Sequence, residues 1–297
     1  MPVGLKEDAT QFKYNPEKIS DEKIREIYAT VVENIYNNEA TSIVNLCKDG
    51  DGKLYIVKIN PTESVERRYI KQNYENHISL QAENFPFVMP LLYAETFNAK
   101  LNPGCKGANF SITRYIEGQS LEKFKANSLD LATINSIIEQ LVEALKALDS
   151  KNYVHRDIKP ANIFIAKDNN KVYIIDFDTL CNGDPEKKMS CMLLGRENTY
   201  RGTYIYARPN SLKTRPYTYR YINDWYSLGL VIQYLAVVSQ AQKPDIRGKG
   251  ESLRLAATLK NIPSIKELEK ICISTKQGGR KTRKSRKSRK QMPPRLL

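Results

Sequence analysis

The spacing of hydrophobic residues differs between the first third of this 297-residue chain and the rest, and this difference most constrains the fold. Runs of β-branched and aromatic residues at 41–48 and 53–59 flank Asp-Gly-Asp-Gly at 49–52, a pattern typical of a β-hairpin. The residues at 110–115 predict another strand, and 65–81 reads as one helix. The first third therefore predicts an antiparallel sheet accompanied by a single helix.

Helices dominate the remainder of the chain. The stretch 131–148 carries apolar residues at mostly three- and four-residue steps, which predicts an amphipathic helix facing a core. The stretch 221–238 is mostly apolar and predicts a helix buried on most sides, whereas 172–175 is a short apolar strand. This order favours an α+β protein with a small antiparallel β-sheet lobe and a larger, mainly helical lobe, joined near 113–120.

Four segments follow from this organisation. We expect a polar N-terminal lead-in at 1–27, the small lobe at 28–113, the large lobe at 114–275 and a basic, disordered tail at 276–297. The tail holds ten Lys or Arg residues and no acidic residue, so it supplies most of the net charge of +14. The charge balance therefore does not require the folded part to be a nucleic-acid-binding fold.

The remaining composition indicates an intracellular protein. No apolar run reaches the roughly 18–20 residues that span a bilayer, and no secretory signal opens the chain. The five cysteines are scattered and odd in number, which favours reduced thiols over a disulfide scaffold. We expect the protein in the cytoplasm or nucleus. The sequence predicts no oligomeric state.

One octet, HRDIKPAN at 155–162, carries the most chemistry. It places the Asp157 carboxylate, the Lys159 ammonium and the Asn162 amide in one short loop. Phosphoryl transfer needs a carboxylate to orient the attacking hydroxyl, a cation near the moving phosphoryl group and an oxygen ligand for magnesium. Asp and Asn are also common turn residues, so it is the whole string that favours the catalytic interpretation.

A second acidic group follows the short strand at 172–175. Asp176, in Ile-Ile-Asp-Phe-Asp at 174–178, lies at the end of that strand and fourteen residues after Asn162. Because magnesium prefers oxygen ligands, Asp176 suits a second metal ligand.

Together these segments resemble the catalytic loop and the Asp-Phe-Gly motif of eukaryotic-type serine/threonine protein kinases. The resemblance spans about residues 28–272 and implies a two-lobed protein kinase that uses ATP with Mg²⁺ or Mn²⁺ and phosphorylates protein substrates. It implies that Asp157 and Lys159 are catalytic and that Asn162 and Asp176 bind the metal. It also implies that Thr203 contacts Asp157 and Lys159, and that Asp224 anchors the catalytic-loop backbone.

The resemblance assigns the nucleotide site as well. Lys58, in Leu-Tyr-Ile-Val-Lys-Ile at 54–59, would hold the α- and β-phosphates, with Glu75 as its partner and Glu66 or Glu83 as alternatives. The residues implied to surround adenine are Val44, Ile56, Thr113, Arg114, Ile116 and Phe164, with Arg114 and Ile116 acting through backbone groups.

Several positions depart from the family pattern. The loop expected to cover the phosphates has Asn37, Glu39 and Ser42 where kinases carry glycine, which predicts an altered nucleotide pocket. Asp178 replaces the glycine of Asp-Phe-Gly. Arg-Pro-Asn at 208–210 replaces Ala-Pro-Glu, so an ion pair of the family is expected to be missing. The large lobe at 114–275 is also expected to be abbreviated relative to the family, because only about fifty residues separate Asp224 from the basic tail.

These departures keep rival functions open. A pseudokinase, acting as a nucleotide-binding or scaffold module, is the main alternative. A small-molecule kinase is a second alternative, against which Lys159 and Gly-Thr at 202–203 favour protein acceptors. The tail is expected to bind nucleic acid, an import receptor or an anionic membrane surface, or simply to aid solubility. Similar tails occur in proteins of large DNA viruses, so a viral source, with the host cell or virion as location, is a further expectation.

Overall fold

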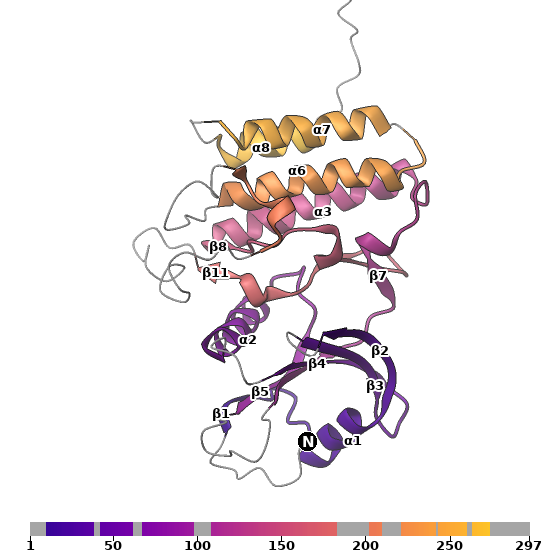
Figure 1. Cartoon of the computed structure of the whole chain (residues 1–297), viewed down its shortest axis with the longest axis vertical. Helices are drawn as coiled ribbons and strands as arrows, with labels where there is room; N and C mark the ends of the chain where they lie inside the picture. Colours follow the sequence, from indigo (N-terminus) through magenta and orange to yellow (C-terminus); the bar gives the residue numbers. More distant parts are fainter. Residues whose placement is uncertain are drawn as a thin grey trace, which may run out of the picture.

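The computed structural model describes residues 10–38, 42–61, 67–97, 108–182, 202–209, 221–241, 243–259 and 263–273. They form a sheet-based lobe and a helical lobe (Figure 1), which confirms the predicted α+β organisation. The tail at 276–297 lies outside the described residues, as do Glu39, Glu66 and Asn210.

The small lobe is built on a six-stranded sheet whose order is β1-β5-β6-β4-β3-β2, with every neighbouring pair antiparallel. Its strands are β1 (Thr10–Tyr14), β2 (Val31–Asn38), β3 (Ser42–Lys48), β4 (Leu54–Pro61), β5 (Leu91–Phe97) and β6 (Ala108–Arg114). The predicted hairpin is the β3–β4 connection. The Asp49 carboxylate accepts the N–H groups of Asp51 and Lys53 there, and Gly52 takes a positive φ of 79°.

Two helices accompany this sheet, where the sequence predicted one. Helix α2 (Arg67–Ala82) matches the prediction, but α1 (Asp21–Ala29) is additional. The Ser20 hydroxyl caps α1 by accepting the N–H of Lys23, and acidic residues occupy its first turn. Ile24 and Ile27 of α1 are fully buried against one face of the sheet. Ordered structure therefore starts earlier than the lead-in at 1–27 implied, because both β1 and α1 pack into the small lobe.

The large lobe is centred on two buried helices, α3 (Leu131–Ser150) and α6 (Tyr221–Val238). Both match the predicted ranges closely, and α6 lies between α3 and α7 (Lys243–Ala256) in Figure 1. Asp130 caps α3, and the apolar stripe of α3 is buried in the main core. Short strands line the side facing the small lobe: β7 (Gly118–Ser120), β8 (Tyr153–Val154), β9 (Ile163–Ala166), β10 (Val172–Ile174) and β11 (Cys181–Asn182). The chain described here ends with α8 (Ile265–Ile273).

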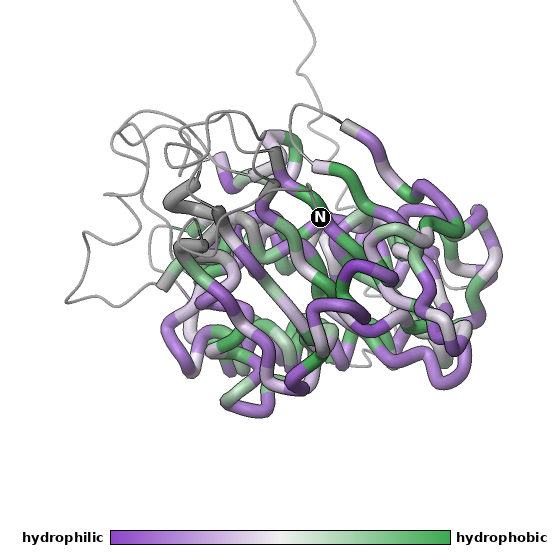
Figure 2. The backbone as a smooth tube through the Cα atoms, turned by 90° about the horizontal axis from the view of Figure 1, so that it is seen from below, coloured by the Kyte–Doolittle hydropathy of each residue, from purple (hydrophilic) through white to green (hydrophobic). Residues whose placement is uncertain are grey.

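Two further findings bear on the composition analysis. Hydrophobic and hydrophilic stretches alternate along the described chain (Figure 2), and none of the helices in these ranges is long and apolar enough to cross a membrane. Cys47 and Cys272 are buried free thiols, but Cys181 forms a disulfide whose partner lies outside the described residues. The expectation of uniformly reduced cysteines is therefore wrong for Cys181.

Candidate active site

The loop at 155–162 is held in place by a carboxylate from α6. Asp224 accepts the N–H of His155 at 2.6 Å and that of Arg156 at 2.9 Å. Arg156 has a φ of 71°, in the left-handed region, so the loop needs such an anchor. Burial raises the pKa of Asp224 to about 7, although the two N–H donors act in the opposite direction. The predicted anchoring role of Asp224 is confirmed.

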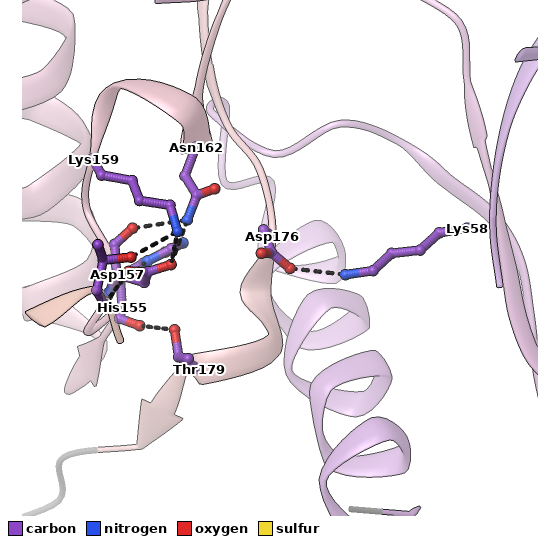
Figure 3. A network of polar contacts seen from close by, with 8 residues as sticks. Lys58, His155, Asp157, Lys159, Asn162, Asp176 and Thr179 are labelled. Carbon is purple, nitrogen blue, oxygen red and sulfur yellow. Dashed lines mark hydrogen bonds and ion pairs between the residues drawn. The ribbon is translucent and has the colours of Figure 1, made fainter. Parts of the chain in front are cut away.

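Asp157 is enclosed by donors on both carboxylate oxygens (Figure 3). Oδ2 accepts from Lys159 Nζ at 2.7 Å and from Asn162 Nδ2 at 2.9 Å, and Oδ1 accepts the N–H of Thr203 at 2.7 Å. Lys159 Nζ also donates to the Thr203 hydroxyl at 2.8 Å. The predicted contacts of Thr203 are confirmed, and together they fix the orientation of a carboxylate that is 7% exposed.

Asp176 faces the small lobe from the end of β10. Its carboxylate lies 2.8 Å from Lys58 Nζ on β4, so two residues 118 positions apart meet between the lobes (Figure 3). Asp176 also has a left-handed φ, of 65°. The N–H of Ile175 donates to the carbonyl of Asn162 at 2.9 Å, which ties the backbones that carry the two predicted metal ligands.

These two residues fit a magnesium ion by their donor chemistry. The Asn162 amide nitrogen is engaged by Asp157, and its amide oxygen lies on the side toward Asp176 in Figure 3. The described ranges contain no group of three or more His, Cys, Asp or Glu residues that would hold a metal unaided. Such a pair of oxygen donors suits Mg²⁺, which usually completes its coordination with phosphate oxygens and water.

Phe177 connects the site to α2, and here the structure adds residues that sequence reasoning missed. Its ring lies edge-on between the rings of His77 and His155, with centroid distances of 5.1 and 5.4 Å. Burial lowers the pKa of each histidine to about 4. His77 Nε2 contacts the carbonyl of Met89 at 2.8 Å, which fixes the ring from the small-lobe side.

Thr179 is another supporting residue that the sequence did not reveal. Its hydroxyl donates to the carbonyl of His155 at 2.8 Å, and its own carbonyl accepts from Arg156 Nε. A lone threonine or histidine carries no motif by itself, and only its neighbours in space show the role.

One face of the small-lobe sheet groups residues that were assigned to the nucleotide. Val44 is the cross-strand partner of Lys58, and Ile56 is the partner of Thr113, so all four side chains share that face. Their neighbours along the strands point to the opposite face, where α1 packs. Ile116 and Phe164 are half-buried at the start of the large lobe. Roles in adenine binding stay predictions for these residues.

Comparison with known proteins agrees with this geometry. The family model of the protein kinase domain matches residues 38–287, which is most of the chain. The chain belongs to the protein kinase family. The confirmed α+β fold with two lobes is the fold of that family.

Individual kinases match at low identity. The chain is 33% identical to mouse sperm motility kinase 2B over 128 residues, covering 42% of this chain and 24% of the relative. It is 26% identical to the MAP kinase kinase MKK1/SSP32 of Saccharomyces cerevisiae over 212 residues, covering 68% and 38%. It is 30% identical to the tobacco mitogen-activated protein kinase kinase SIPKK over 182 residues, covering 60% and 45%. The chain thus spans less than half the length of these relatives.

The hinge between the kinase lobes leaves the predicted backbone contacts with adenine as predictions. The N–H of Arg114 donates to the carbonyl of Pro90 at 3.1 Å. The backbone group that Arg114 would offer to adenine is therefore its own carbonyl. The Arg114 guanidinium lies 3.4 Å from Glu17, a residue of the expected lead-in. Glu75 is half-buried on α2, and its pairing with Lys58 stays a prediction.

The departures from the kinase pattern are only partly described. Asn37 and Ser42 lie near the ends of β2 and β3, so this hairpin forms without glycine at either position. The Asp178 side chain lies outside the described residues, although its backbone belongs to the short turn Phe177–Thr179. Arg208, the first residue of Arg-Pro-Asn, donates through Nε to the carbonyl of Ala257 at 2.7 Å.

Proposed function

We propose that this protein kinase transfers the γ-phosphate of ATP to serine or threonine hydroxyls of protein substrates. The observation that carries the proposal is the enclosed Asp157 carboxylate, which accepts from Lys159, Asn162 and Thr203 within 3 Å. Family membership supports phosphotransfer to proteins, and the site supplies every side-chain type that the reaction needs.

The residues of the site divide the reaction between them. Asp157 orients the acceptor hydroxyl and takes its proton as the hydroxyl oxygen bonds to the γ-phosphorus. The bond from the γ-phosphorus to the bridging oxygen breaks in the same displacement, and ADP leaves with that oxygen. Lys159 lies 2.7 Å from Asp157 and stabilises negative charge on the transferring group.

Residues at the junction of the two lobes would bind the phosphates of ATP. Lys58 lies beside Asp176, so its ammonium group is placed to hold phosphate oxygens next to the predicted metal ligands. Asn162 and Asp176 would hold Mg²⁺, which neutralises phosphate charge when it is bound. The half-buried apolar face at Val44 and Ile56 would cover the adenine ring.

Serine/threonine selectivity rests on Lys159 and its contact with Thr203. In the kinase resemblance, lysine two residues after the catalytic aspartate marks the serine/threonine branch. The 2.8 Å bond to the Thr203 hydroxyl holds this ammonium beside the acceptor position. Tyrosine acceptors are therefore not expected.

A direct assay separates this function from a pseudokinase. The full chain is incubated with γ-labelled ATP, Mg²⁺ and a protein mixture, and acid hydrolysis identifies the labelled amino acid. We expect phosphoserine or phosphothreonine, lost in Lys58→Met. Absence of transfer with retained nucleotide binding would establish the pseudokinase instead, and phosphotyrosine would overturn the assigned selectivity.

For the tail at 276–297 we propose a docking role for polyanions such as nucleic acid, or for an import receptor. Its ten basic residues without an acidic one support the proposal. Binding to a nucleic acid duplex should weaken steeply with salt and vanish when 276–297 is deleted. Binding that survives the deletion would exclude the tail as the docking segment.

A further inference from the structure

The turn at 202–209 returns to the catalytic loop and is tied to it at its beginning. Thr203 donates its N–H to Asp157 and receives a hydrogen bond from Lys159, at 2.7 and 2.8 Å. The next residues form a short 3-10 turn, Tyr204–Tyr206. Any contact that fixes this turn therefore also fixes the Thr203 N–H that orients Asp157.

Apolar burial does not hold the tip of the turn. Tyr204 and Ile205 are 68% and 76% exposed, the highest values among the exposed large hydrophobic residues that the structure describes. Two polar anchors lie after the tip instead. Ser227 of α6 donates to the carbonyl of Tyr206 at 2.8 Å, and Arg208 donates to the carbonyl of Ala257 at 2.7 Å.

The carbonyl that Arg208 reaches is a suitable anchor for a cation. Ala257 directly follows α7, is fully buried, and continues the helical pattern by donating its N–H to Leu253 at 2.9 Å. The last carbonyls of a helix lack partners within the helix and carry the negative end of its dipole. An arginine donor both satisfies such a carbonyl and is favoured by the dipole.

Helix α7 is a fixed support for this contact because it packs tightly on α6. A Cβ added at Gly229 of α6 would lie 2.8 Å from the carbonyl oxygen of Gly250 on α7, and one added at Gly250 would lie 2.5 Å from that of Gly229. The same α6 carries Asp224, which holds the catalytic loop. The catalytic loop and the turn at 202–209 are thus both anchored to the packed pair of helices α6 and α7.

We propose that Arg208 is a positioning residue for phosphoryl transfer. Its bond to α7 fixes the end of the turn, so that Thr203 keeps Asp157 and Lys159 aligned with the acceptor hydroxyl. Pro209 contributes by restricting the backbone of Arg208 to extended conformations. This inference rests on the proposed kinase activity and adds a residue that lies outside the motifs assigned to catalysis.

The test compares Arg208→Met, which keeps length but removes the donor, with Arg208→Lys, which restores a cationic donor. Arg247→Met, an exposed arginine on α7, is the matched control. We expect kcat for a protein substrate to fall roughly tenfold in Arg208→Met and to recover in part in Arg208→Lys. ATP affinity should stay within about twofold in all three, because the nucleotide residues lie on other elements.

Two results would overturn the proposal. One is an unchanged kcat in Arg208→Met. The other is a parallel loss of ATP affinity and melting temperature without rescue by lysine, which would mark a merely structural role.

A double-mutant cycle with Thr203→Ala tests whether Arg208 acts through Thr203. We expect the fold-loss from Arg208→Met to shrink in part in the Thr203→Ala background, since alanine removes the hydroxyl that accepts from Lys159 but keeps the N–H that donates to Asp157. Losses that simply multiply would show that Arg208 does not act through the Thr203 hydroxyl and would refute that coupling.

Hydrogen exchange keeps the proposal testable even if the chain transfers no phosphate. Arg208→Met should speed amide exchange at 203–207 and at 155–159, whereas Arg247→Met should not. Unchanged exchange at both segments would refute the positioning role without reference to activity. A failure of the kinase assay alone would refute only the proposed function.

Discussion

The catalytic loop at 155–162 and the β2–β3 hairpin, which the kinase resemblance assigns to the phosphates, are held in very different ways. Asp157, at the centre of the loop, is 7% exposed and accepts from three residues, and Asp224 fixes the backbone before it. Strand β2 is an edge strand, and Val31 and Val32 on it are each 50% exposed. If the hairpin covers ATP as the resemblance implies, the chemical step and ATP binding depend on separate elements of the fold.

The largest effect should come from the centre of the loop. Asp157→Asn removes the proton acceptor and keeps the size of the side chain, so kcat should fall roughly 10²–10⁴-fold. ATP affinity should change by less than about twofold, because binding relies on other residues. Steady-state kinetics with a protein substrate measure both, with the exposed Asp168→Asn as control. A comparable loss of ATP affinity would contradict the assignment of catalysis to the loop and of ATP binding to the hairpin.

The anchor beneath the loop should matter next. In Asp224→Asn one of the two N–H groups of His155 and Arg156 loses its acceptor, which should lower kcat about 10- to 100-fold. The exposed Asp245→Asn on α7 serves as a control for removing a carboxylate. Activity equal to that of the control would show that the loop keeps its left-handed backbone unaided.

On the hairpin side, adding glycine should affect nucleotide binding alone. The double substitution Asn37→Gly and Ser42→Gly gives the backbone freedom to approach phosphate, so KM for ATP should fall about three- to tenfold. kcat should remain within about twofold. A large change in kcat with constant KM would contradict the assignment of this hairpin to the phosphates.

The smallest expected effect concerns the stability of the small lobe rather than activity. Asp49 is buried, which by itself would raise its pKa, but hydrogen bonds from Tyr55 and Lys23 lower the pKa to about 2. The folded pKa is thus below the unfolded value of 3.8, so ionised Asp49 stabilises the fold above about pH 4. This contribution is lost as the pH falls toward 2.

Thermal unfolding at two pH values measures this effect. Asp49→Asn should melt below the wild-type protein at pH 7, and the difference should shrink at pH 3. Tyr55→Phe removes one hydrogen bond and should give a smaller change. An equal difference at both pH values would show that the charge of Asp49 contributes nothing.

Much of the local structure followed from the sequence because it depends on near neighbours. The range 221–238 matches α6, because a mostly apolar stretch of 18 residues is too long for a typical strand and forms a buried helix. The hairpin at 49–52 followed from Asp and Gly, whose turn preferences act within four residues. The string at 155–162, through its resemblance to the kinase catalytic loop, also pointed to Asp157, whose carboxylate lies at the centre of the site.

The missed features depend on partners far along the chain. Strand β1 lacks a strong pattern of its own and becomes a strand by pairing with β5, more than eighty residues later. Helix α1 was missed because only two of its residues, Ile24 and Ile27, are buried. His77 gains a role only because folding brings Phe177 beside it.

The sequence by itself thus determined the longest helices, the β3–β4 hairpin and the chemical groups of the kinase site, because local propensities and motif strings are properties of adjacent residues. The tertiary structure alone decided which groups meet. Lys58 lies next to Asp176, Thr179 donates to the carbonyl of His155, and Arg208 reaches the end of α7. Those contacts join residues between 24 and 118 positions apart. They depend on how α6, α7 and the sheet pack, which no short stretch of sequence encodes.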